Sequence, residues 1–224
     1  MSLTSQASTA LDEGLLKLQD IDIPTEMRRQ LLSYIGLLIK WNRVYNLTAV
    51  RDSRTMVERH LLDSLVLLRW LPALSLNPGR LASSERAVDV VDIGSGAGLP
   101  VLPLAIARPD LSFVSIESNG KKTRFQQQVL VELALANVQV QHGRVQEASL
   151  QGAFITSRAF TAPESFLQIA EPLCSANAQV AIMLGHADKL PQPLPAPFKL
   201  EQLEPVDIPG AAGARHIALC RHCE

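Results

Sequence analysis

Apolar residues in the first third of the chain recur at intervals of three and four positions, which is the period of an amphipathic helix. They predict one long helix over residues 25–47, a shorter one over 11–18, and a third over 55–71 that Pro72 would end. Residues 1–75 are therefore expected to form a helical region.

The pattern changes after a polar segment, residues 76–86, which contains Ser, Pro and Gly and is predicted to be a linker. Short runs of β-branched apolar residues then alternate with helical patterns, which predicts βαβ units and a parallel sheet. The predicted helices include 99–108 and 121–135, and the predicted strands are 87–93, 111–117, 138–143, 153–159, 178–184 and 214–221.

The segment VVDIGSGAGLPV, residues 90–101, places glycines at 94, 96 and 98 directly after the first predicted strand. Ligands bind at the carboxyl ends of the strands in such sheets, so this turn is the expected binding site. A P-loop would need a Lys soon after the glycines, but none occurs before Lys121. A dinucleotide-binding loop would need a third glycine where Leu99 stands.

The Gly-x-Gly-x-Gly pattern after Asp92 resembles motif I of the class I methyltransferases that use S-adenosylmethionine (SAM). SAM has no phosphate, and the carboxylate of Asp92 can stabilise its cationic amino and sulfonium groups. Glu117 ends the second predicted strand, where an acid can accept hydrogen bonds from both ribose hydroxyls. The alternative, a tight turn with Glu117 as a solvated strand end, leaves three alternate glycines unexplained. The expected cofactor is therefore SAM.

This resemblance implies an α/β fold of the class I SAM-dependent methyltransferase type. Residues 87–224 are expected to form a Rossmann-like domain with a largely parallel seven-stranded sheet. Residues 1–75 would pack on it as an N-terminal helical extension.

Motif I does not identify the methyl acceptor, but two acceptor classes lack their signatures here. Enzymes that methylate adenine amino groups commonly carry an Asn/Asp-Pro-Pro-Tyr/Phe loop after the fourth strand, where this chain has ITSRAF at 155–160. Enzymes that methylate pyrimidine C5 commonly use a Cys after Pro, whereas Cys174 follows Leu173, in a predicted helix. No nucleophile or general base is evident. Guanine N7 needs neither, because it has a free lone pair and no proton to lose, and the sequence permits that reaction without proving it.

Four segments together resemble the RsmG family, also called glucose-inhibited division protein B. They are WNRVYNLTAVRD (41–52), RHLLDS (59–64), DIGSGAGLP (92–100) and SRAF (157–160), supported by RPDLSFVSIESNGKKTRF (108–125). The resemblance implies a SAM-dependent enzyme that methylates N7 of one guanosine in 16S rRNA, position 527 by the usual numbering, in the loop of helix 18. The implied partner is 16S rRNA or the assembling small ribosomal subunit.

The resemblance, together with the two acids above, also implies which residues hold the cofactor. Val145 and Gln146 would meet the adenine, and the amide oxygen of Gln146 would replace an acid that the family often has there. The predicted cofactor-binding residues are Asp92, Gly94, Gly96, Gly98, Leu99, Glu117, Val145, Gln146 and Arg158.

Three side chains are predicted to be catalytic: Arg158, His60 and Asn46. Arg158 matches a family arginine at the active site, where a cation can contact the SAM carboxylate or an RNA phosphate; the alternative is a surface arginine. His60 and Asp63 share a helix face, which either borders the SAM pocket or forms a buried pair that orients two helices. Asn46 can instead cap the turn in YNLT.

Basic residues concentrate in the helical region. Residues 28–69 contain eight Lys or Arg and three acids, whereas residues 159–224 contain four basic and seven acidic residues. Phosphate binding predicts such a patch, and a solvated charged face is the alternative. The predicted RNA-binding residues are Arg28, Arg43, Arg51, Arg54, Arg59, Lys121, Lys122 and Arg124.

The chain departs from the family pattern at two positions. Val101 follows Pro100 where the family commonly has Gly, and it is expected to add bulk at a helix start and to tighten the pocket. Leu184 precedes Gly185 where the family often has Lys, so one expected cation is missing.

Composition adds exclusions rather than a function. The chain has 224 residues and a net charge of -1, so no overall basic field would recruit nucleic acid. No apolar run reaches the ~18 residues of a membrane span, no secretory signal is evident, and a cytoplasmic monomer is expected. Three cysteines argue against a disulfide framework, and the pair Cys220 and Cys223 is expected to be structural or incidental, with no metal.

Three other functions compete with the rRNA methyltransferase. A SAM methyltransferase acting on a small molecule or protein would not need the segments 41–52 and 59–64. A non-catalytic RNA-binding protein that kept the fold would not need Asp92, Gly94 and Glu117. A nicotinamide oxidoreductase is the weakest alternative, because Leu99 replaces the third glycine.

Overall fold

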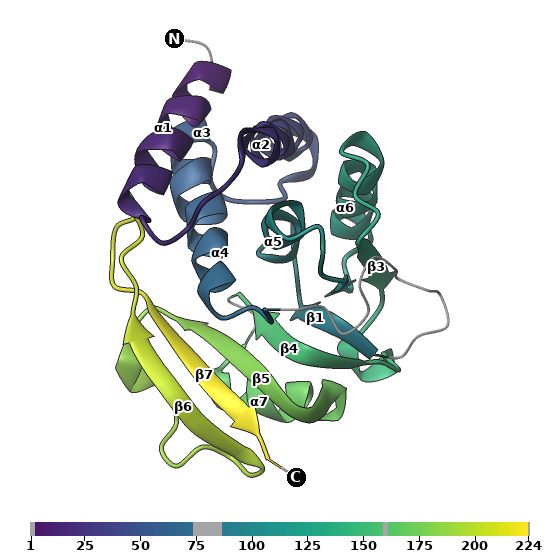
Figure 1. The fold of residues 1–224 in the computed structure, drawn as a ribbon. Helices are drawn as coiled ribbons and strands as arrows, with labels where there is room; N and C mark the ends of the chain where they lie inside the picture. The colour runs from purple at the N-terminus through teal and green to yellow at the C-terminus, as the bar shows by residue number, and fades with distance from the viewer. Residues whose placement is uncertain (1–2, 74–86, 159–160, 224) are drawn as a thin grey trace.

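The structure is a computed structural model that describes residues 3–73, 87–158 and 161–223. The predicted linker, 76–86, and the last residue of the predicted strand 153–159 lie outside the described residues. The described part forms one seven-stranded sheet with helices on both faces (Figure 1). Its strands are β1 (Ala87–Ile93), β2 (Phe113–Glu117), β3 (Val138–His142), β4 (Gln151–Ser157), β5 (Cys174–Leu184), β6 (Phe198–Pro205) and β7 (His216–His222).

The strand order is β3-β2-β1-β4-β5-β7-β6, and the sheet is largely parallel as predicted. The first five strands pair in parallel, while β7 pairs antiparallel with both β5 and β6. The start of β7 therefore lies at the edge where the parallel strands end, and Leu184 pairs with His216 there. This edge is where ligands bind in α/β sheets.

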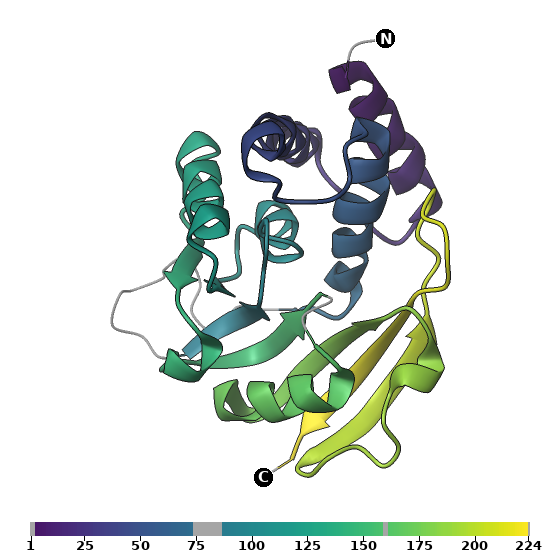
Figure 2. The same cartoon turned by 180° about the vertical axis from the view of Figure 1, so that it is seen from behind.

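Most of the helices cover one face of the sheet, and α7 covers the other (Figures 1 and 2). The helices are α1 (Leu3–Lys17), α2 (Thr25–Tyr45), α3 (Ser53–Met56), α4 (Asp63–Leu65), α5 (Val101–Ala107), α6 (Gly120–Glu132) and α7 (Pro163–Ala170). A π-helical segment, η1 (Val57–Leu62), joins α3 to α4, and a 3-10 turn, η2 (Val66–Arg69), follows α4. Further 3-10 turns are η3 (Val145–Glu147), η4 (Glu171–Leu173) and η5 (Ala187–Lys189).

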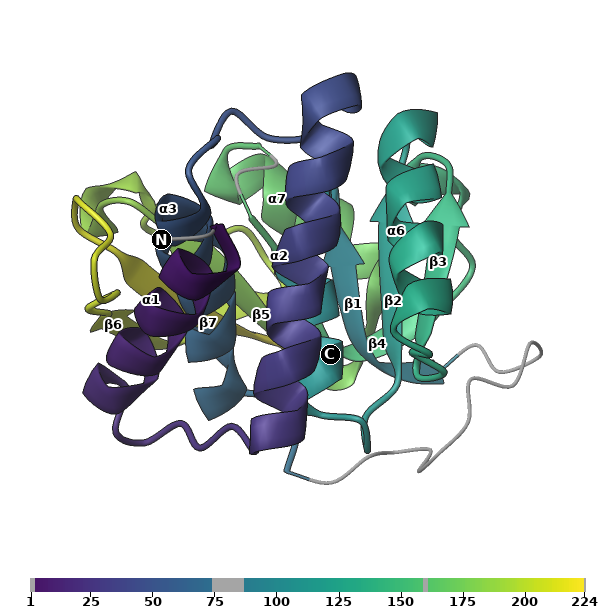
Figure 3. The same cartoon turned by 90° about the horizontal axis from the view of Figure 1, so that it is seen from above.

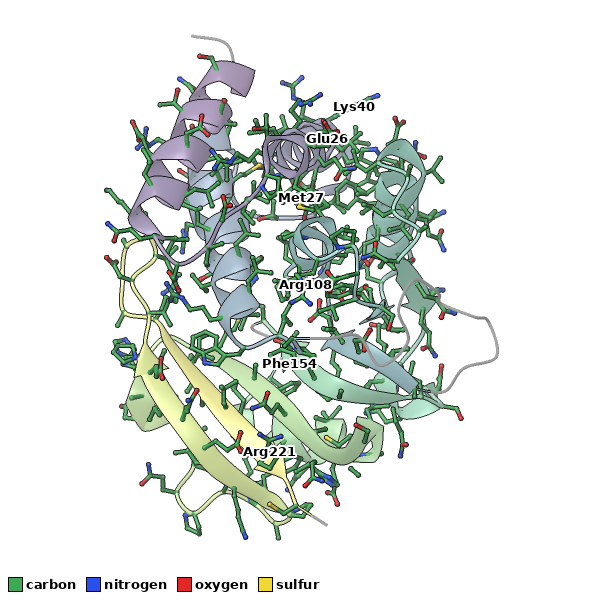
Figure 4. All side chains as sticks on the ribbon, viewed as in Figure 1. Glu26, Met27, Lys40, Arg108, Phe154 and Arg221 are labelled. Carbon is green, nitrogen blue, oxygen red and sulfur yellow. The ribbon has the colours of Figure 1, made fainter. Side chains whose placement is uncertain are left out.

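Alternation along the strands produces a hydrophobic core on each face of the sheet. Val90 of β1 belongs to the core shared with the N-terminal helices, whereas Val91 belongs to the core under α7. Phe154 of β4 is fully buried between the sheet and the helical layer (Figure 4). The N-terminal helices and the sheet thus share one core, which fixes the helical residues over the strand ends.

Several predicted elements differ from the observed ones. The predicted helix 55–71 contains the π-helical segment η1, and the short helix predicted over 11–18 is longer, from Leu3 to Lys17. Strand β6 was not predicted, because Lys199, Glu201 and Gln202 give it the polarity of a loop. The prediction that Cys174 lies in a helix is wrong. It begins β5, because Pro172, inside the 3-10 turn η4 that follows α7, cannot continue an α-helix and a strand pattern follows.

Candidate active site

The glycine loop after β1 has a backbone that side chains would disturb. Gly94, Gly96 and Gly98 have φ angles of 70°, 58° and 82°, which lie in the left-handed region that favours glycine. A Cβ on Gly98 would lie 2.3 Å from Cδ1 of Leu102. The alternate glycines therefore have a structural cause: the chain turns tightly here and packs directly against α5.

Three side chains from other elements hold this loop in place. The Tyr34 hydroxyl of α2 donates to the Ala97 carbonyl at 2.9 Å, and Gln126 Nε2 of α6 donates to the Gly96 carbonyl at 2.8 Å. The Gly96 amide in turn donates to Glu117 Oε2 at 2.7 Å, at the end of β2. The long N-terminal helix thus supports the loop directly.

Asp92 is a buried carboxylate next to the loop. Its side chain is fully buried, and neither carboxylate oxygen has a hydrogen-bond partner among the described residues. Burial raises the pKa of Asp92 to about 7, while the nearby Ser95 hydroxyl, then the positive charge of Arg158 and the Val101 amide, act in the opposite direction. A buried acid without a partner is the feature expected where a cationic ligand group completes a site.

A cavity of about 430 Å³ opens beside the loop at the ends of β1, β2 and β3. Its lining includes Gly94, Glu117, Lys122, Val145 and Gln146. The predicted ribose-binding acid and both predicted adenine-binding residues therefore face one space with the first glycine. These residues fit SAM, because the site combines acceptors for hydroxyls, an apolar wall at Val145 and an unpaired carboxylate nearby.

A second cavity of about 430 Å³ lies on the other side of β1, at the ends of β4 and β5. Part of its lining comes from the helical region, namely Arg59, His60 and Asp63. The end of β5 and the residue before β7 contribute Met183, Leu184, Gly185 and Arg215. Arg158, directly after β4, also lines it. Because β1 lies between β2 and β4 in the sheet, the glycine loop separates the two cavities.

Arg158 and Asp63, which both line this second cavity, form an ion pair. Arg158 Nη1 donates to the Arg59 carbonyl at 2.8 Å and to Asp63 Oδ2 at 3.3 Å, and Arg215 Nε lies 3.4 Å from Asp63 Oδ1. Asp63 is almost buried, so one carboxylate orients two guanidinium groups that are each about a quarter exposed or less. The alternative of Arg158 as a simple surface residue does not describe this position.

His60 is held as a neutral ring. Burial first, and the positive charge of Arg158 second, lower the pKa of His60 to about 4. Its Nδ1 lies 3.4 Å from Arg158 Nη1, and a guanidinium can only donate, so Nδ1 accepts. Nε2 therefore carries the proton and donates to Thr48 Oγ1 at 2.9 Å. His60 contacts Arg158 rather than pairing with Asp63.

Asn46 lies outside this cluster. It ends α2 in the left-handed conformation, its side chain is exposed, and its Oδ1 accepts from Arg51 at 2.6 Å. The neighbouring buried Asn42 organises the same turn through Thr48 and Val50. The structure thus gives Asn46 the capping position that was its alternative role.

Several of the predicted RNA-binding residues make hydrogen bonds or ion pairs within the protein, and some of these are nevertheless exposed. Arg28 bonds to the Ile23 carbonyl and pairs with Asp12, while Arg54 pairs with Glu13 and Glu58. Lys122 and Arg59 line the two cavities. The exposed members are Arg43, Arg51, Arg54, Arg59, Lys121 and Arg124.

Val101 and Leu184, the two departures from the family pattern, lie in different surroundings. Val101 is fully buried in the core at the start of α5 and is not among the described residues that line either cavity. Leu184 and Gly185 line the second cavity, which therefore has an apolar wall where a cation was expected.

The cysteines lie away from both cavities. Burial raises the pKa of the Cys174 and Cys220 thiols to about 12, and no cluster of three or more His, Cys, Asp or Glu able to hold a metal occurs within the described ranges. None of the described helices is long and apolar enough to cross a membrane.

Sequence reasoning missed Arg215, Thr48, Tyr34 and Gln126. Arg215 directly precedes the last strand, and it reaches the cavity because that strand runs antiparallel. Antiparallel pairing would have been the signal for Arg215. The roles of Thr48, Tyr34 and Gln126 depend on long-range contacts that no local pattern encodes.

The chain matches the family described as GidB, rRNA small subunit methyltransferase G, over residues 27–218. The ribosomal RNA small subunit methyltransferase G of Ectopseudomonas mendocina (strain ymp) is 42% identical, over 99% of this chain and 99% of its own length. The protein of the same name from Nitrosomonas eutropha is 38% identical over 94% and 95%. The structure of TrmN from Thermus thermophilus aligns with a TM-score of 0.53 and 17% identity, covering 71% of this chain and 48% of that one. The predicted fold class is confirmed.

Proposed function

The chain belongs to the GidB family of rRNA small subunit methyltransferases G, and we propose that it transfers a methyl group from SAM to N7 of one guanosine in 16S rRNA. As a member of this family the chain is a SAM-dependent methyltransferase. The proposal places the target at position 527 by the usual numbering, in the loop of helix 18. It further places the chain in the cytoplasm, as a monomer that meets 16S rRNA or the assembling small subunit.

One observation carries the choice of N7: none of the described residues that line the second cavity is suited to removing a proton from a methyl acceptor. His60 is neutral, yet its lone pair faces Arg158, and Asp63 is paired with two arginines. An acceptor nitrogen that loses a proton on methylation would need a general base. Guanine N7 loses none, so alignment and exclusion of water are sufficient.

The residues of this chain divide the work between the two cavities. When bound, SAM supplies a methyl group activated by a positive sulfur. Glu117, Val145 and Gln146 would hold the adenosine end, and the buried carboxylate of Asp92 would stabilise a cationic group beside the loop. N7 would accept this methyl group through its lone pair, and the residues of the two cavities would align the base with the cofactor and exclude water.

Arg158 lines the second cavity, and its positive charge also acts on Asp92 beside the glycine loop. Its guanidinium is fixed by the Arg59 carbonyl and by Asp63, so it is preorganised for an anion. A SAM carboxylate and an RNA phosphate both fit that description. In either case Arg158 positions a reactant and needs no change of protonation.

The proposal is tested by methyl transfer from tritiated SAM to small subunits from cells that lack the modification. The expected product is 7-methylguanosine, identified by chromatography of the nucleosides. Subunits from cells that already carry the methyl group are the matched control and should accept no label. A different methylated nucleoside would keep the methyltransferase and overturn the N7 assignment. No label on any subunit would overturn the rRNA substrate.

A further inference from the structure

We propose that Tyr45, packed against Trp41 at the end of α2, forms a platform on which a nucleobase flanking the target guanosine stacks. The proposal rests on the proposed function, since it assigns a contact with the same RNA. It concerns a surface outside both cavities and a residue that none of the roles above uses.

The platform is the exposed end of a row of aromatic rings that contact one another at tilted angles. The Trp41 ring lies 5.2 Å from the Tyr45 ring and 5.7 Å from the Phe125 ring, measured between centroids, and Phe125 lies 6.2 Å from Tyr34. Phe125 and Tyr34 are fully buried, whereas 42% of Tyr45 is exposed. The buried ring of Phe125 contacts Trp41, and Trp41 in turn contacts Tyr45. A rigid, partly exposed aromatic ring is what base stacking requires.

The platform is also close, along the chain and across α6, to residues that line the two cavities. Helices α2 and α6 run side by side, and Phe125 and Lys122 are one turn apart on α6 (Figures 1 and 3). Lys122 lines the cavity beside the glycine loop, called here the cofactor cavity. Ala49 and Val50, shortly after Tyr45 in the chain, line the second cavity, called here the acceptor cavity. A strand of RNA with its target base in the acceptor cavity would therefore pass close to this ring.

The charge around the platform fits a nucleic acid. Residues 40–51 and 118–131, which frame the two rings, contain six basic residues and no acidic residue: Lys40, Arg43, Arg51, Lys121, Lys122 and Arg124. Lys40 points away from the sheet (Figure 4), and Lys121 and Arg124 are exposed at the start of α6. Basic side chains around an exposed aromatic pair favour single-stranded RNA, whose phosphates and bases they can contact together.

The test compares Tyr45→Leu with Tyr45→Phe. The Leu variant keeps an apolar contact with Trp41 but removes the ring face, and the Phe variant keeps the ring. Val44→Ser is the matched control, because Val44 directly precedes Tyr45 and is 69% exposed but does not belong to the row of aromatic rings. For each variant, the Kd for unmodified small subunits, the Kd for protein-free 16S rRNA and the Kd for SAM would be measured, with the KM and kcat of methyl transfer.

We expect Tyr45→Leu to weaken binding of both RNA forms and to raise the KM about tenfold, within the roughly 5-fold to 150-fold range of base–aromatic stacking. The Phe and Ser variants should bind as the wild type does, and all should bind SAM equally. RNA binding by Tyr45→Leu at the wild-type level would overturn the platform. A matching loss of SAM affinity would also overturn it, because Tyr45 would then support the glycine loop through the row of aromatic rings. Weaker binding of whole subunits but not of protein-free 16S rRNA would overturn it as well, because it would indicate a contact with a ribosomal protein. Wild-type protein that methylates no subunit would instead overturn the proposed function itself.

Discussion

Replacing Asp92 with Asn should change how the stability of the ligand-free protein depends on pH. Asp92 is fully buried without a hydrogen-bond partner among the described residues, and its pKa is raised from 3.8 to about 7. A raised carboxyl pKa favours the protonated form in the folded state. Its contribution to stability is therefore complete below pH 3.8 and is lost as the pH rises through about 7.

The magnitude follows from the two pKa values of Asp92. The interval from 3.8 to about 7 corresponds to a loss of about 4 kcal/mol in the free energy of unfolding, of which about 2–3 kcal/mol falls between pH 5 and pH 8. An Asn side chain has the same shape and no charge to bury, so this part of the pH dependence should disappear.

Urea unfolding of both proteins at pH 5, 6, 7 and 8, without SAM, would measure the effect. We expect the Asp92→Asn protein to gain stability relative to wild type steadily across this range. Parallel curves, with the same difference at every pH, would refute the raised pKa of Asp92, because its protonation would then be the same in the folded and the unfolded protein. The Asn variant should also bind SAM more weakly at pH 8, as measured by calorimetry, because it cannot stabilise a cation.

Three further predictions concern the site. Glu117→Gln should lower the affinity for SAM about tenfold by calorimetry, because an amide cannot accept from the Gly96 and Asn119 amides and from ribose together; unchanged affinity would remove Glu117 from the site. The kcat at saturating SAM should show no ionisation of His60 between pH 6 and pH 8, because the pKa of His60 is about 4; a rate that falls below pH 6.5 in both the wild type and the Asp92→Asn protein would indicate that His60 titrates there. Arg158→Ala should lower kcat at least tenfold while Arg221→Ala, which changes an arginine paired with Glu201 on β7 (Figure 4), should not; equal rates for the two variants would exclude Arg158 from the reaction.

The cofactor loop could be predicted from the sequence because its constraints are local. Alternate glycines after a buried strand require a left-handed backbone, and all three have it. Glu117 was placed at the end of a strand by the apolar run before it, and the structure places it there. A strand end is a position that both the sequence pattern and the sheet define, so prediction and structure coincide.

The acceptor cavity could be predicted only in part, because its residues come from distant elements. His60, Asp63 and Arg158 were identified, but their arrangement was not. Arg158 reaches across to the π-helical segment η1, and η1 interrupts what the sequence presents as a regular helix. Arg215 enters only because β7 reverses direction, which depends on strand pairing far along the chain.

Mapping the methylated base would test the central claim most directly. Small subunits from cells that lack the modification would be incubated with this protein and SAM, and their 16S rRNA treated with borohydride and aniline, which cleaves at 7-methylguanosine. The account predicts one new cleavage, at position 527 in the loop of helix 18. Cleavage at another guanosine, or methyl transfer with no cleavage, would contradict it.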